Sequence, residues 1–141
     1  MIIQQLSVFL ENRAGRLTDV TGALAAQRIN ITALCIAESS DFGVLRMVVS
    51  DPERAKKVLA ECGFSVSLTD VICVTTPDEP GALHRALQIL SDRGISIDYM
   101  YAFAVGKKAC VVLRTTDIAA SVSALLEKKQ TLMSASELYS F

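Results

Sequence analysis

Apolar and polar positions alternate and recur in an order that the chain uses twice. Residues 2–10 alternate, which predicts a strand with Leu6, Val8 and Leu10 on one face. The helical spacing that follows, from Leu17 onward, predicts an amphipathic helix that ends near Arg28. A strand leading into a helix is therefore the first unit of the pattern.

The rest of the first half predicts two strands, a helix and a further strand. Residues 31–37 and 44–49 are apolar and partly β-branched, as strands are. Asp51 followed by Pro52 predicts a helix start, with Asp as N-cap and Pro at the first helical position. Residues 64–68 predict a fourth strand, so the order of this half is βαββαβ.

The second half repeats this order. Its predicted elements are a strand at 71–75, a helix from Leu83 that ends by Gly94, strands at 97–103 and 109–113, a helix capped by Asp117, and a weaker strand at 132–138. We therefore predict two domains, residues 1–69 and 70–141, joined only by Thr69-Asp70. The fold class is α+β: two tandem ferredoxin-like βαββαβ domains, each an antiparallel sheet with helices on one face.

Size and charge limit the function classes. The chain has 141 residues, of which 51% are hydrophobic, and a formal net charge of −1. Domains of about 70 residues are marginally stable alone, so we expect the halves to bury surface against each other or in an oligomer. Nothing in the overall charge favours nucleic acid or an anionic membrane as a partner.

The four cysteines, Cys35, Cys62, Cys73 and Cys110, are isolated, with no CxxC spacing. Small buried residues kept reduced in a cytosol are the favoured interpretation, and no metal site is expected. The N-terminus does not have the pattern of a signal peptide, and no apolar run is long enough to span a membrane. We therefore predict a cytoplasmic protein with no membrane partner.

The two loops between first strand and first helix carry the candidate chemistry. They read Glu11-Asn12-Arg13-Ala14-Gly15-Arg16-Leu17 and Asp78-Glu79-Pro80-Gly81-Ala82-Leu83, with the glycines 66 positions apart. A glycine at a strand-to-helix turn lets backbone N–H groups approach a ligand, and a helix N-terminus favours a carboxylate or phosphate. These loops are predicted to bind a small molecule.

Other functions of this fold fit less well. An RNA-binding module needs aromatic residues on its central strands, and neither 44–48 nor 109–113 has any. A metal-carrying version would place two cysteines in the first loop, where this chain has none. For catalysis, His84 is the one histidine and its counterpart in the first half is Thr18. We predict no catalytic residue, no cofactor and no enzyme activity.

The loop motifs, together with Ile29-Asn30-Ile31 and Ile95-Ser96-Ile97, resemble the ACT domain. This family is the small amino-acid-binding regulatory module of biosynthetic enzymes. The resemblance covers essentially the whole chain as two tandem copies. Ala14 stands where a proline is usual. The first loop is most similar to the serine-binding regulatory domain of 3-phosphoglycerate dehydrogenases, although Leu10 occupies the position of a histidine that helps there.

The resemblance implies a ligand between two ACT domains, held by loop backbone N–H groups and by side chains of the loop and second strand. Asn12 and Asn30 would carry the asparagine roles. Two alternatives stay open, since Asn12 could instead be a helix cap or a turn residue and Asn30 could be an ordinary turn residue. The predicted ligand-binding residues are Asn12, Arg13, Ala14, Gly15, Leu17, Asn30 and Ile31 in the first copy and Asp78, Glu79, Pro80, Gly81, Ala82, Leu83, Ser96 and Ile97 in the second.

The copies differ on their second strands. One face carries small residues in the first copy and aromatic residues in the second: Ala33, Cys35 and Ala37 against Tyr99, Tyr101 and Phe103. The two sets could form complementary surfaces, or they could pack against the chain's own helices. If the aromatic strand closes one pocket, the two sites would differ in size.

We predict from this a regulatory protein that binds a free amino acid at ACT domain interfaces and modulates a partner or its own assembly. A homodimer or higher homo-oligomer is expected, with a biosynthetic enzyme as a candidate partner. The alternative is a ligand-independent regulatory subunit of an enzyme such as acetolactate synthase.

Overall fold

The computed structural model describes residues 1–39 and 41–141. Its fold is α+β with antiparallel strand pairs, as predicted. Ser40, part of a predicted turn, lies outside the described residues. In chain order the elements are β1 (Ile3–Glu11), α1 (Arg16–Ala26), β2 (Ile31–Glu38), β3 (Phe42–Val49), α2 (Pro52–Glu61), β4 (Ser65–Pro77), α3 (Ala82–Asp92), β5 (Ile97–Val105), β6 (Lys108–Thr115), α4 (Ile118–Glu127), β7 (Thr131–Leu132) and α5 (Ala135–Tyr139).

The chain divides into two compact units. We call them the N-terminal unit, Gln4–Thr69 with Leu138–Phe141, and the C-terminal unit, Met1–Ile3 with Asp70–Glu137. β4 is one uninterrupted strand of 13 residues that contributes its first part to one unit and its second part to the other. Thr69 and Asp70 therefore lie inside a strand, not in a linker.

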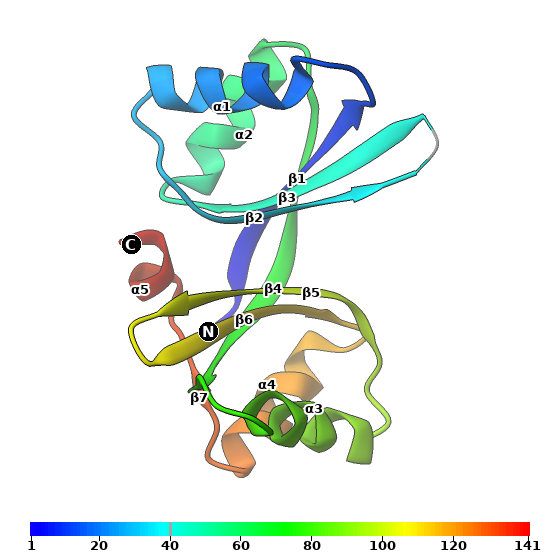
Figure 1. Ribbon diagram of the computed structural model, residues 1–141, viewed down its shortest axis with the longest axis vertical. Helices are drawn as coiled ribbons and strands as arrows, with labels where there is room; N and C mark the ends of the chain where they lie inside the picture. The colour runs from blue at the N-terminus through cyan, green and yellow to red at the C-terminus, as the bar shows by residue number, and fades with distance from the viewer. Residues whose placement is uncertain (40) are drawn as a thin grey trace. The chain divides into compact units, whose positions relative to one another are not determined.

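In the N-terminal unit the strand order is β2-β3-β1-β4, and α1 and α2 cover one face of the sheet (Figure 1). β3 pairs antiparallel with both β1 and β2. Alternate strand residues meet the apolar stripes of the helices, because side chains of a strand point to opposite faces in turn. This core includes Leu6, Val8, Val20, Leu24, Leu45, Met47 and Leu59, all with no exposed surface.

The C-terminal unit repeats the arrangement. β6 pairs antiparallel with β4 and β5, β7 pairs with β4, and α3 and α4 cover one face (Figure 1). Backbone hydrogen bonds recur at an offset of 66: Ile29 N donates to Leu24 O, and Ile95 N donates to Leu90 O. The sequence repeat is therefore also a repeat of backbone geometry.

Both predicted aspartate caps are confirmed. The Asp51 carboxylate accepts a hydrogen bond of 3.2 Å from Arg54 N, and the Asp117 carboxylate accepts one of 2.9 Å from Ala120 N. Each satisfies a backbone N–H that has no partner within its own helix. In this part of the chain, local sequence alone decides where a helix begins.

The predicted strand at 132–138 is wrong. β7 ends at Leu132, and α5 follows. Ser134 and Glu137 explain the change: Ser134 Oγ accepts from Glu137 N at 3.3 Å, and a Glu137 carboxylate oxygen accepts from Ser134 N at 2.8 Å. This reciprocal pair is a capping box, which starts a helix where the apolar pattern alone favours a strand.

The cysteines are not uniformly buried, so that prediction is wrong for Cys62, which is exposed; Cys35 is half-buried. Cys73 and Cys110 are buried on neighbouring strands. Burial, with a contribution from nearby Cys110, raises the pKa of the Cys73 thiol to about 12. Burial also raises the pKa of the Cys110 thiol. Both thiols are therefore protonated at neutral pH.

The aromatic residues of β5 do not pack against the helices of their own unit. Tyr101 pairs with Val112 on β6, whereas the core residues Val111 and Leu113 pair with Ala102 and Met100. Because faces alternate, Tyr101 lies on the face away from the helices, together with Tyr99 and Phe103. Packing of these residues against α3 and α4 is therefore wrong, and both packing against other helices of the chain and complementary surfaces stay predictions. Within the described residues, no helix is long and apolar enough to cross a membrane.

Asp51→Ala is expected to lower the free energy of unfolding by about 1 kcal/mol, because the α2 cap is lost. Chemical denaturation followed by circular dichroism measures the change. Glu61→Ala, at an exposed site of the same helix that makes no cap, is the control and should shift stability by less than about 0.5 kcal/mol. Equal effects of the two substitutions would contradict the capping role.

Iodoacetamide at pH 8 is expected to label Cys62 first and Cys73 last, because Cys62 is exposed and Cys73 is a buried, protonated thiol. Mass spectrometry of peptides sampled over time measures the order. In concentrated guanidinium chloride the four rates should converge. Labelling of Cys73 as fast as Cys62 in the folded protein would show that the thiol is accessible.

Candidate ligand-binding site

The first loop turns sharply between β1 and α1. Arg13 N donates to Glu11 O at 2.8 Å, and Asn12 N donates to Asp41 O at 3.1 Å, which ties the loop to the β2–β3 hairpin. Gly15 has φ +91°, in the left-handed region that residues with a side chain rarely adopt. The glycine therefore lets the chain enter α1 directly after the strand.

The second loop has the same geometry. Asp78 N donates to Lys107 O at 3.0 Å, the equivalent of the first loop's tie to its hairpin. Gly81 has φ +87°, and α3 begins at Ala82. Glu79 and Arg85 form an ion pair, with 3.1 Å between Glu79 Oε1 and Arg85 Nη2, and both side chains are more than half exposed. Such an exposed pair contributes little stability.

Neither loop helix is capped by a side chain of the described residues, whereas α2 and α4 each have an aspartate cap. The alternative that Asn12 caps α1 is therefore wrong, because the N-cap position is Gly15. Arg16 N donates to Arg13 O at 3.5 Å and Ala82 N donates to Glu79 O at 3.2 Å, so it is the next N–H groups of each first turn that a ligand or water can satisfy. A carboxylate suits this position, because the helix N-terminus carries partial positive charge.

A pocket of about 150 Å³ lies against the first loop. Three of its lining residues, Asn12, Arg13 and Leu17, belong to the predicted site. The others come from both sides of the loop and from the hairpin: Leu10, Glu11, Arg16, Ile36, Glu38 and Gly43. The predicted set omits three charged lining residues, Glu11, Arg16 and Glu38, although Glu11 and Arg16 stand inside the loop motif.

Asn30 and Ile31 lie far from this pocket. They stand at the start of β2, whereas Glu38, which lines the pocket, ends it. Seven strand intervals separate the two ends, roughly 20 Å. A single amino acid cannot contact Asn12 and Asn30 of the same unit.

Asn30 has contacts of its own. Its backbone N–H donates to Ser50 Oγ at 2.9 Å, its carbonyl accepts from Ser50 N at 2.9 Å, and its Nδ2 donates to Phe141 O at 2.9 Å. The backbone pair fits the interpretation of Asn30 as a helix-to-strand turn residue. Ser96 and Ile97 are placed equivalently at the start of β5, with Ser96 N donating to Thr116 Oγ1 at 3.2 Å.

This geometry, two copies of a strand, a glycine turn and an uncapped helix, agrees with the comparison to known families. The family model described as an ACT domain pair matches residues 1–141. The chain belongs to the ACT domain pair family. None of the curated proteins matches it.

Solved structures agree with the family. Protein BT0572 from Bacteroides thetaiotaomicron is 49% identical, with a TM-score of 0.97 over 100% of this chain and 98% of that one. The regulatory subunit of aspartate kinase from Thermus thermophilus, in a ligand-free form, is 16% identical, with a TM-score of 0.65 over 89% and 93%. The corresponding subunit from Thermus flavus is 18% identical, with a TM-score of 0.58 over 90% and 94%. The similarity to the two kinase subunits is one of fold.

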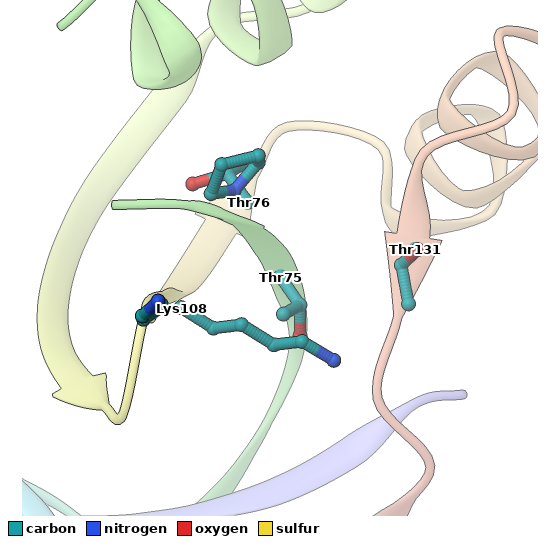
Figure 2. A pocket seen from close by; sticks show the side chains of 6 residues that line it. Thr75, Thr76, Lys108 and Thr131 are labelled. Carbon is teal, nitrogen blue, oxygen red and sulfur yellow. The ribbon is translucent and has the colours of Figure 1, made fainter. Parts of the chain in front are cut away.

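Among the described residues of this ACT pair, a larger pocket of about 380 Å³ lies in the C-terminal unit. Thr75, Lys108 and Thr131 surround it, from β4, β6 and β7 (Figure 2). Pro77 and Lys107 complete the side next to the second loop. None of the predicted residues of the second copy lines it, and its ammonium and hydroxyl groups suit an anion.

Charges around the first ACT loop are largely ordered by local contacts. Arg13 Nε lies 3.2 Å from a Glu11 carboxylate oxygen, and both side chains are exposed, as expected for a solvated loop residue. The Arg16 guanidinium carbon lies 4.4 Å from the centroid of the Phe64 ring. A cation over an aromatic face is held by the ring quadrupole, so Arg16 is more restrained than Arg13. His84 is exposed on α3.

Gly15→Ala is expected to destabilise the protein by about 1–2 kcal/mol, because a side chain is strained at φ +91° although space is open around it. Gly22→Ala is the matched control. It lies on an exposed turn of α1, also with open space, and should stabilise by roughly 0.5–1 kcal/mol. Denaturant melts of both variants measure the change in the free energy of unfolding, which should have opposite signs. A change of the same sign in both would contradict the strained backbone at Gly15.

Proposed function

We propose that this ACT domain pair is a cytoplasmic regulatory protein, not an enzyme, that binds a free amino acid. In this proposal residues 1–69 and 70–141 are two ferredoxin-like βαββαβ domains. Binding changes the association of the protein with itself or with a partner. A ligand that binds one assembled state stabilises that state by linkage, which gives binding a regulatory output.

The observation that carries the proposal is the pocket at the first loop. An amino acid zwitterion needs donors for its carboxylate and acceptors for its ammonium group. The uncapped start of α1 offers backbone donors, and Asn12 and Glu38 offer side-chain oxygens in the same pocket. Leu10, Leu17 and Ile36 supply apolar surface for a side chain.

The position of Asn30 bears on how the ligand is held. Asn30 precedes β2, whereas Asn12 shares a pocket with Glu38 at the other end of that strand, so a ligand that uses both residue types needs a second ACT domain. We propose that such an interface forms in a homodimer or larger homo-oligomer. The remaining predicted residues, Ala14, Ile31, Pro80, Leu83 and Ile97 among them, belong to these proposed interfaces.

The names of the structural neighbours support a regulatory role, since two of them are regulatory subunits of aspartate kinase. A biosynthetic enzyme is accordingly the proposed kind of partner. We predict no catalytic residue in this chain, and we expect that replacement of His84 leaves ligand binding unchanged.

A thermal-shift panel of the twenty common amino acids tests this function. One or a few should stabilise the protein by about 2.7 kcal/mol at 100 times Kd, a shift of several degrees. Asn12→Ala should weaken that shift, and Asp78→Ala, at the equivalent position of the second loop, shows whether the second copy contributes. No shift with any amino acid, together with co-purification of a larger enzyme, would favour a ligand-independent regulatory subunit instead.

A further inference from the structure

The two loops differ in the charged side chains around them. The repeat maps each residue of the first copy onto the residue 66 positions later. Arg16, which begins α1, corresponds to Ala82, which begins α3. Glu38 ends β2 and pairs with Gly43 on β3. Its equivalent is Ala104 on β5, which pairs with Ala109 on β6. Two of the four charged residues that line the first pocket, Arg16 and Glu38, are thus replaced by alanine in the second copy, whereas Glu11 and Arg13 correspond to Pro77 and Glu79.

We propose that Glu38 and Arg16 select the ligand at the first loop, as acceptor for an ammonium group and donor to a carboxylate. The ligand class is a small zwitterionic amino acid, and the second loop, with Ala82 and Ala104, does not bind it. This inference rests on the proposed function. It specifies which copy binds the ligand, which side chains select the ligand and what size of ligand fits.

Glu38 has the chemistry that an ammonium group requires. An ionised carboxylate is a pure acceptor, and its hydrogen bonds to a cation are stronger than those of a neutral amide such as Asn12. Glu38 reaches the pocket because the β2–β3 hairpin ends beside the first loop, where Asn12 N bonds to Asp41 O. The other pocket carboxylate, Glu11, is already paired with Arg13.

Arg16 stands at a position where a cation is unfavourable. It is the first residue of α1, where the helix already carries partial positive charge. The Asp19 carboxylate, 3.4 Å away and exposed, offsets this only in part. An anion in the pocket would offset it further.

The Arg16 side chain is also held in place before any ligand arrives. It packs over Phe64 and is only 22% exposed, and its Nε is buried without a hydrogen-bond partner among the described residues. A fixed guanidinium loses little conformational entropy when it binds a carboxylate. Arg16 is therefore a preorganised donor, unlike the exposed Arg13.

The pocket volume limits the ligand. At about 150 Å³ it lies below the range of about 300–1,000 Å³ that is typical of pockets for drug-sized ligands. Glycine, alanine and serine are of suitable size, and tryptophan is not. The apolar wall of Leu10, Leu17 and Ile36 favours a short side chain over a charged one.

Isothermal titration calorimetry of the full chain tests the proposal, with glycine, L-alanine, L-serine and L-tryptophan as probes. At least one small amino acid should bind with one site per chain, and L-tryptophan should bind at least tenfold more weakly. Propionate and ethylamine, which lack the ammonium and the carboxylate of alanine, separate the two charge contacts.

Glu38→Gln should raise the Kd of the small amino acid at least tenfold, while the Kd of propionate should change by no more than twofold. Arg16→Gln should weaken the binding of the amino acid and of propionate, but not the binding of ethylamine. Glu61→Gln and Lys57→Gln, exposed charges on α2 of the same unit, are matched controls and should leave binding unchanged. If Arg16→Gln melts early, Arg16→Lys keeps the charge, and it should bind with intermediate affinity.

The failures are distinguishable. Two identical, independent sites per chain, or a twofold effect or less for Glu38→Gln, would overturn the selection by Glu38 and Arg16 while the proposed function stands. Binding only of a large amino acid would overturn the size argument alone. Absence of binding by every common amino acid would remove the proposed function itself.

Discussion

One strand, β4, serves both units, and its register constrains everything else in the fold. Its even-numbered residues Val66 and Leu68 pack on the core of the N-terminal unit, and Ile72 and Val74 lie in the core of the C-terminal unit. Asp70, exposed, occupies the same parity between them. Because side chains alternate with a period of two, one inserted residue would turn one of these stripes away from its core. Both copies therefore depend on the side-chain alternation of one strand.

That constraint explains why the copies keep the same backbone while their surfaces diverge. Glycine turns, helix starts and hairpin ties recur at an offset of 66, since each depends on core packing that both units need. Arg16 and Glu38 both line a pocket, and their equivalents Ala82 and Ala104 carry no charge. In the second copy, Lys107 and Lys108 provide charge beside the loop instead. The two copies of one fold thus place different charged residues beside equivalent loops.

The parts of the fold with local causes could be predicted from the sequence. Asp51 and Asp117 start helices because their carboxylates reach N–H groups three residues ahead. The strand predicted over 132–138 is wrong for an equally local reason: Leu132, Met133 and Leu138 favour a strand, but the capping box of Ser134 and Glu137 starts a helix. The pocket was harder, because Glu38 reaches it only through the hairpin. The distance between Asn12 and Asn30 also follows from strand direction, which a loop motif does not express.

The end of the chain completes the N-terminal unit and touches the residue that the ACT resemblance assigns to the ligand. Leu138 has no exposed surface, and the Tyr139 hydroxyl accepts from Gln4 N at 2.8 Å. Phe141 O accepts from Asn30 Nδ2. An amide nitrogen carries two N–H groups, so this bond uses one and leaves the other N–H and the amide oxygen for further contacts. The bond also favours one orientation of the amide, while Asn30 itself stays exposed.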